Sequence, residues 1–204
     1  MISKRSSKWL MLVVFVVAVP MTALAAKKTQ TTPGKYEHWG PDIDEIEIVS
    51  SFKTSDYETI VAEPVDTSST PPAEDADMAE KVEKVLRDAR TPLVEGVQKK
   101  ISGLTVAESI PADKSKTLIL RTKVTLMDPG SRSKRMWIGY GAGAARAAVE
   151  AEIVDAATGN VLVRFTQERR SGIERFGRGS SYEEIMKRNL VAIGEDVAKL
   201  LKEF

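Results

Sequence analysis

The chain contains no cysteine and only one histidine, His38, among its 204 residues. Without cysteine it has no disulfide framework, no thiol nucleophile, no thiolate metal site and no lipid-bearing cysteine. A single histidine excludes metal clusters built on several imidazoles. Aromatic residues make up only 6% of the chain, and 30 basic against 29 acidic side chains give a formal charge of +1. This balance provides no overall attraction to polyanions, so we expect no nucleic-acid partner.

The longest apolar run lies near the start of the sequence. Basic residues up to Lys8 precede an apolar run over 9–19, and small residues follow Pro20. This order is typical of a secretory signal peptide, which we assign to residues 1–25 with cleavage before Ala26. An uncleaved membrane anchor is the alternative, but about eleven helical residues reach only about 16 Å, roughly half the hydrocarbon thickness. We therefore expect a periplasmic or secreted protein with no stable transmembrane span after cleavage.

Composition divides the mature chain into two parts. Residues 26–57 are expected to form a flexible N-terminal segment, because most of this segment is polar, rich in turn formers and without a sustained apolar period. Residues 58–204 are expected to form a single α+β domain. A base on a flexible segment cannot hold a catalytic geometry, so His38 is not a catalytic candidate. The neighbouring aromatics Tyr36 and Trp39 either provide a docking point for a partner or fold back on the domain.

Two stretches have the apolar spacing of amphipathic helices. The first runs from Met78 to Ile101 and contains Pro92, which would cost about 3 kcal/mol in a helix interior. The pattern predicts either one helix bent at about Thr91 or two nearly collinear helices that share a buried face. The second helix is expected to begin near residues 180–181, where serine is suited to capping, and to continue to the end of the sequence.

Three segments alternate between apolar and mainly charged residues, with the period of two that is typical of half-buried strands. They cover residues 118–126, 147–153 and 161–166. The turn between the last two contains Gly159, and a left-handed conformation at this glycine sets Glu152 opposite Arg164. Pairing of opposite charges across strands favours the acidic strand in the middle.

Together these elements predict an α+β fold built as a two-layer sandwich. Shorter β-prone runs lie at 46–49 and 59–62, and we expect one of them to enter the sheet. The predicted sheet is mostly antiparallel with about four strands. Two long helices cover its apolar face and leave its charged face open to water.

No combination of residues indicates catalysis. The run 139–145 superficially matches a dinucleotide-binding fingerprint, but that motif follows a buried strand and opens a helix, whereas this run precedes a strand pattern. The carboxylate pairs Glu150/Glu152 and Glu183/Glu184 are explained by a solvated strand face and by the first turn of a helix. We therefore expect a protein that is not an enzyme and has no cofactor or metal site.

Two basic segments with interleaved aromatic residues flank the glycine-rich run and are placed to converge on one end of the sheet. Such a patch would bind an acidic surface of an envelope protein or an anionic envelope component. Charged loops that only keep a small domain soluble are the alternative. The candidate residues are Arg132, Arg135, Trp137, Tyr140, Arg169, Arg170, Arg175 and Arg178.

The glycine-rich run and the hairpin turn also carry a resemblance. The stretches 128–130, 137–143 and 155–162 resemble the bacterial domain-of-unknown-function 4410 (DUF4410) family, with a likeness over roughly residues 58–201. The resemblance implies an exported protein, often a lipoprotein, with no assigned activity. This sequence departs from the lipoprotein members because no cysteine follows the leader.

The leading hypothesis is an exported, non-enzymatic binding or adaptor module of the cell envelope. A second hypothesis is a small-ligand-binding protein or a hydrolase with a carboxylate-based site, which requires a polar pocket with carboxylates of raised pKa. A third is self-association through an exposed strand edge.

Overall fold

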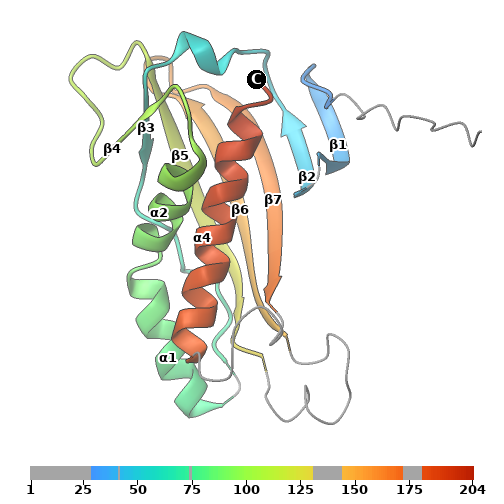
Figure 1. The fold of residues 1–204 in the computed structure, drawn as a ribbon, viewed down its shortest axis with the longest axis vertical. Helices are drawn as coiled ribbons and strands as arrows, with labels where there is room; N and C mark the ends of the chain where they lie inside the picture. The colour runs from blue at the N-terminus through green and yellow to red at the C-terminus, as the bar shows by residue number, and fades with distance from the viewer. Residues whose placement is uncertain (1–28, 41, 74, 131–143, 172–180) are drawn as a thin grey trace, which may run out of the picture.

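A computed structural model describes residues 29–40, 42–73, 75–130, 144–171 and 181–204 (Figure 1). Within these ranges, one mixed sheet of seven strands forms one layer and three α-helices form the other. The strands are β1 (Gly34–Trp39), β2 (Ile43–Ile48), β3 (Thr59–Ala62), β4 (Thr105–Ala107), β5 (Thr117–Asp128), β6 (Ala145–Asp155) and β7 (Val161–Ser171). The helices are α1 (Ala76–Arg87), α2 (Arg90–Lys100) and α4 (Tyr182–Leu201), with a short 3-10 helix η1 (Thr54–Asp56). The fold is α+β, but the predicted sheet of about four mostly antiparallel strands under two long helices is wrong.

The strand order across the sheet is β1-β2-β7-β6-β5-β3-β4. The long strands β5, β6 and β7 pair antiparallel at the centre, and β1 and β2 extend the sheet beyond β7. β3 runs parallel to both β4 and β5. Parallel neighbours need a crossover connection, and α1 and α2 provide it after β3. The sequence pattern does not predict β4, which is only three residues long, and it marks β3 only as the β-prone run 59–62 without its parallel partners.

The β1–β2 hairpin lies inside the segment 26–57 that the sequence predicts to be flexible, so that prediction is corrected here. Ile43, Ile46 and Ile48 of β2 are buried in the core, and charged residues stand between them. The charged residues lower the average hydrophobicity of the segment and hide a half-buried strand. Both β-prone runs, at 46–49 and 59–62, therefore contribute to the sheet, where the sequence analysis expected one.

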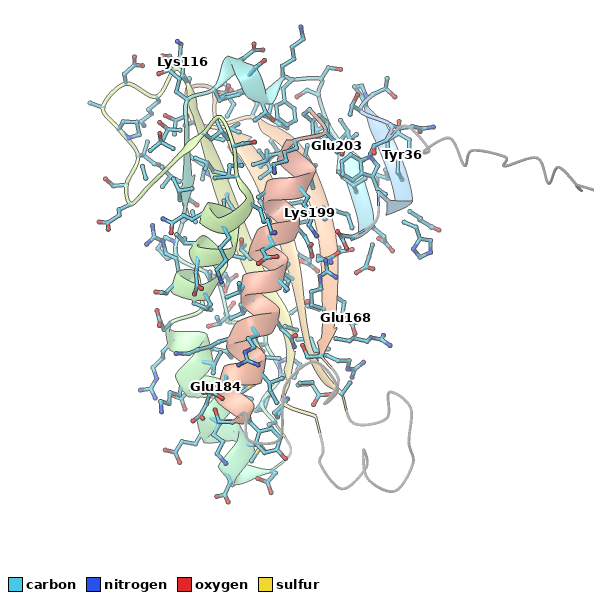
Figure 2. The ribbon with its side chains drawn as sticks, in the orientation of Figure 1. Tyr36, Lys116, Glu168, Glu184, Lys199 and Glu203 are labelled. Atoms are coloured by element: carbon cyan, nitrogen blue, oxygen red, sulfur yellow. The ribbon has the colours of Figure 1, made fainter. Side chains whose placement is uncertain are left out.

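The aromatic residues of the hairpin fold back on the domain. Trp39 is 5% exposed, and its ring stacks on Phe204 with ring centroids 5.8 Å apart. Phe204 also stacks on Phe52, with centroids 4.6 Å apart. Tyr36 lies half-buried on β1 at the edge of the sheet (Figure 2), and its hydroxyl hydrogen-bonds Thr32. The stack of three rings fastens the hairpin to the residues that follow α4.

The β6–β7 hairpin has the predicted register. Glu152 lies opposite Arg164, Ala151 lies opposite Phe165, and Gly159 has a φ of 74°. The alternation then places Ala147, Val149, Ala151 and Ile153 of β6 and Val163 and Phe165 of β7 in the core on the helix side. The acidic strand β6 lies between β5 and β7, also as predicted.

The apolar pattern over 78–101 forms two helices, which was one of the two predicted alternatives. They run one above the other beside α4 (Figure 1). The break precedes Arg90, so Pro92 falls in the first turn of α2, where a missing N–H breaks no helical hydrogen bond. α4 begins after Ser181, whose hydroxyl accepts a hydrogen bond from the N–H of Glu184 in a capping box.

The helices α2 and α4 contact each other through glycines. Gly96 of α2 and Gly194 of α4 are both buried. A Cβ atom at Gly96 would overlap the carbonyl oxygen of Val191, and one at Gly194 would overlap the carbonyl oxygen of Leu93. The lack of side chains at these two positions lets the two backbones touch.

Across the described ranges, none of the helices has both the length and the apolar composition that a membrane crossing requires. The predicted leader, residues 1–25, lies outside these ranges, so its assignment stays a prediction.

Candidate functional site

The face of the sheet opposite the helices forms the candidate site. All three helices lie on one side of the sheet (Figure 1), and strand alternation sends charged side chains to the other side. A groove of about 790 Å³ crosses this open face, and no helix residue lines it. Its lining has a formal charge of −3, although the whole chain carries +1. The charged lining residues are Lys35, Glu37, Glu45, Glu47, Glu63, Asp66, Arg121, Lys123, Glu150, Glu152 and Arg164.

One row of these side chains forms an ion-pair ladder of alternating sign across the sheet. From β1 to the residue after β3, the ladder is Lys35, Glu47, Arg164, Glu152, Arg121 and Glu63. Arg164 contacts Glu152 at 2.9 Å and Glu47 at 3.4 Å, and the hydrogen bond to Glu152 raises the pKa of Arg164. Arg121 contacts Glu63 at 3.0 Å. The basic side chains and carboxylates of the ladder therefore compensate each other, and the ladder contributes no net charge to the groove.

The neighbouring row, two residues along each strand, is acidic. This acidic row consists of Glu37, Glu45, Thr166, Glu150, Lys123 and Asp66. Glu37, Glu45 and Glu150 are exposed, and none of the three forms an ion pair with another described residue. Glu37 stands directly opposite Glu45, so two like charges face each other on adjacent strands. These carboxylates are accessible to a ligand.

The spacing of the acidic row suits an extended ligand better than a single ion. Neighbouring strands are about 4.8 Å apart, so carboxylates on different strands are separated by multiples of this distance. Across the described parts of the chain, no three His, Cys, Asp or Glu side chains converge as a metal site requires. His38 is exposed in the β1–β2 hairpin, with a φ of 50°. The geometry is that of a broad polar contact surface.

A second group of charges lies on the helix side, under α4. Asp196 is 1% exposed and accepts hydrogen bonds from Arg169 and Gln167 of β7. Arg169 and Lys199 also contact Asp42, at 2.9 and 2.7 Å, and Figure 2 shows Lys199 on α4. Burial raises the pKa of Asp196. Burial opposes ionisation of Asp42 as well, but hydrogen bonds from Lys199 and Arg169 outweigh it and lower the pKa of Asp42. This charge cluster ties α4, β7 and the β1–β2 loop together.

Only two members of the predicted basic patch lie in the described ranges, and the structure does not bring them together. Arg169 and Arg170 are neighbours in β7, so their side chains point to opposite faces of the sheet. Arg169 belongs to the buried charge cluster. Arg170 contacts Glu168 at 2.7 Å, and Figure 2 shows Glu168 near the lower end of β7. A binding patch that includes Arg132, Arg135, Trp137, Tyr140, Arg175 and Arg178 stays a prediction, because these residues lie outside the described ranges.

The sequence analysis did not single out the acidic row, although one signal for it was present. Glu45 and Glu47 alternate with buried isoleucines, which places both glutamates on the face away from the core. The predicted solvated pair Glu150 and Glu152 does lie on the open strand face, where both residues line the groove. What the sequence could not show is that strands distant in sequence bring these carboxylates into one row.

A family model described as a domain of unknown function (DUF4410) matches residues 47–173, which is more than half of the chain. The chain belongs to the DUF4410 family. The match confirms the resemblance drawn from the glycine-rich run and the hairpin turn. The match runs from the end of β2 to just past the end of β7, and the family description names no activity.

Solved structures resemble this DUF4410 protein at low identity. The PelC dodecamer from Paraburkholderia phytofirmans is 16% identical, with 74% of this chain and 96% of that chain covered and a TM-score of 0.39. The hypothetical protein CT253 from Chlamydia trachomatis is 8% identical, with coverages of 71% and 98% and a TM-score of 0.40. The lipoprotein GNA1162 from Neisseria meningitidis is 17% identical, with coverages of 59% and 86% and a TM-score of 0.30. No curated protein sequence matches the chain.

Proposed function

We propose that this DUF4410 protein is a non-enzymatic binding or adaptor module of the cell envelope that docks a partner protein on the open face of its sheet. The groove on this face is the observation that carries the proposal. Side chains from β1, β2, β5, β6 and β7 line it, and within the described ranges no helix covers it. A sheet face of this kind offers a broad contact area with charged groups at defined spacings, which suits recognition of a macromolecule.

The same groove is a poor site for acid–base catalysis. A hydrolase with a carboxylate-based site needs a carboxyl group of raised pKa near its substrate. Among the described carboxylates, burial raises the pKa of Asp196, which lies under α4 on the other side of the sheet. In the groove itself, hydrogen bonds from Ser68 lower the pKa of Asp66. These directions favour binding over hydrolysis.

Export is the second part of the proposal. The basic start, the apolar run over 9–19 and the small residues before Ala26 support a cleaved leader, which assigns the mature protein to the periplasm or the extracellular space. The chain has no cysteine to carry a lipid, so a partner in the envelope would have to hold it through protein contacts.

Site-specific photo-crosslinking in intact cells tests the docking surface. A photoreactive residue replaces Thr166, at the centre of the groove, or Lys187, which is exposed on α4. We expect a discrete crosslinked species from position 166 and none from position 187. Crosslinking from 187 alone, or equally from both positions, would place the contact elsewhere and contradict the proposal.

A further inference from the structure

The two rows of the groove differ in the charge that they leave uncompensated. In the ion-pair ladder, three basic side chains alternate with three carboxylates, so the net charge is zero. In the acidic row, four carboxylates stand with one lysine, Lys123. The whole charge of −3 in the groove therefore belongs to the acidic row. These carboxylates are exposed and keep their hydration, and their uncompensated negative charge makes the row an attractive site for cations.

The pairing of β1 with β2 adds a local repulsion. Glu37 and Glu45 occupy directly opposite positions, and like charges at such positions destabilise a sheet. No described basic side chain forms an ion pair with either of them. A cationic group bound between the two carboxylates would remove this repulsion, so binding would be favoured by the relief as well as by the new contact.

The spacing of the acidic row matches an extended chain that lies across the strands. Glu45 of β2 and Glu150 of β6 have β7 between them, which sets them about 10 Å apart. Glu37 of β1 lies three strand spacings, about 14 Å, from Glu150, and in an extended peptide side chains four positions apart share one face about 13 Å apart, so alternate basic residues match this distance. A calcium or magnesium ion needs several oxygens within about 2.6 Å and cannot bridge it.

We propose that the acidic row binds an extended, lysine- or arginine-bearing segment of a partner protein. The proposal rests on the docking function above, because it names the chemistry of the partner for the same groove. Glu37, Glu45 and Glu150 receive the basic side chains, and the neutral ladder beside them contributes a polar rim. A nucleic acid or an acidic protein segment has the wrong sign of charge for this row.

Peptide binding to the purified mature chain tests the proposed chemistry. The probe is a fluorescent peptide of about twelve residues with alternating lysine and serine, and a glutamate–serine peptide of equal length is the control. The test variant is the double change Glu45→Gln and Glu150→Gln. The matched variant is Glu80→Gln and Glu83→Gln, which removes the same charge from the exposed side of α1. Fluorescence anisotropy gives the dissociation constant at about 50 and about 300 mM salt.

We expect the lysine peptide to bind the native chain, with roughly tenfold weaker binding to the groove variant and less than a twofold change for the α1 variant. The higher salt concentration should weaken binding to the native chain. Equal weakening by both variants would indicate non-specific attraction and overturn the proposal, as would preference for the glutamate peptide or failure of the native chain to bind the lysine peptide. Thermal unfolding of each variant verifies that it is folded.

The crosslinking experiment separates this inference from the docking function. If position 166 crosslinks to a partner segment without basic residues, the docking function stands and the acidic row is not its recognition element. If position 166 yields no specific crosslink, the docking function fails and removes the basis for the inference.

Discussion

Single side chains of the open face differ in their effect on the folded state. Arg164 is held between two glutamates, whereas Glu37 and Glu45 face each other without a cation from the described residues. Proteins often retain such a repulsion where it serves binding, and its removal then increases stability. The acidic row is thus a place where stability and the proposed binding oppose each other.

Neutralising one member of the repelling pair should stabilise the isolated protein. We expect Glu37→Gln to increase the free energy of unfolding by about 0.3 kcal/mol, because a cross-strand repulsion is lost. Glu47→Gln is the matched control on the adjacent strand. It removes a contact with Arg164 and should not stabilise. Urea denaturation at low salt measures both, and destabilisation by Glu37→Gln would contradict the assignment of an uncompensated repulsion.

The hydrogen bond between Tyr57 and Asp155 links the start of β3 to the β6–β7 turn. The hydroxyl of Tyr57 donates to the carboxylate of Asp155 at 2.9 Å. Burial and this hydrogen bond to a carboxylate raise the pKa of Tyr57 above its ordinary value of 10.0. Burial opposes ionisation of Asp155, but hydrogen bonds from Thr158 and Tyr57 outweigh it and lower the pKa of Asp155.

The raised pKa of Tyr57 predicts a loss of stability at alkaline pH. A group with a raised folded-state pKa contributes its full stability below its unfolded pKa and loses it as the pH rises above about 10. Tyr57→Phe should cost about 1 kcal/mol at pH 7 and should lose less stability than the native chain above about pH 10. Urea denaturation at pH 7 and at a pH above about 10 measures the free energy of unfolding, with Tyr36→Phe as the control. Parallel losses in the native chain and Tyr57→Phe would contradict the prediction.

At the scale of elements, sequence reasoning succeeded where the determining residues are close in the chain. The β6–β7 register follows from Gly159 and two alternating segments beside it, and the start of α4 follows from Ser181 and Glu184. It failed where pairing is distant. β2 pairs with β7 more than a hundred residues later, and β3 is a short buried strand whose parallel partners follow a helical crossover. No local period encodes these neighbours, so neither the seven strands nor the acidic row could be predicted.

The glycine contact between α2 and α4 has a large expected energetic effect. Gly96→Ala places a methyl group on the carbonyl oxygen of Val191, and a backbone atom cannot move aside as a flexible side chain does. We expect destabilisation by about 3 kcal/mol. Gly159→Ala is the control, because it meets no atom within 4 Å and only strains a positive φ, at a cost of about 1 kcal/mol. Equal costs in urea denaturation would show that the helices separate easily.

At the scale of the whole molecule, the stacked rings decide whether the β1–β2 hairpin stays on the sheet. Phe204→Ala removes the ring between Trp39 and Phe52. We expect amide hydrogen exchange in residues 34–48 to become at least tenfold faster, with the centre of β5 and β6 unchanged. Val49→Ala, at an exposed apolar residue after β2, is the control and should leave exchange unchanged. Uniform acceleration across the sheet would mean that the hairpin does not open independently.

Export predicts the form in which the protein accumulates. Cleavage before Ala26 removes the basic start and the apolar run. Intact-mass analysis of the protein from the periplasmic or extracellular fraction should give a chain that begins at Ala26. A chain that still carries residues 1–25, recovered with membranes, would instead support the anchor alternative.

The glycine contact also has a mechanical consequence. Where two helices meet through side chains, those side chains can change rotamer and let one helix slide along the other. Between Gly96 and Gly194 there is no such deformable layer, because backbone rests on backbone. We therefore expect α2 and α4 to move as one unit and not to slide along each other.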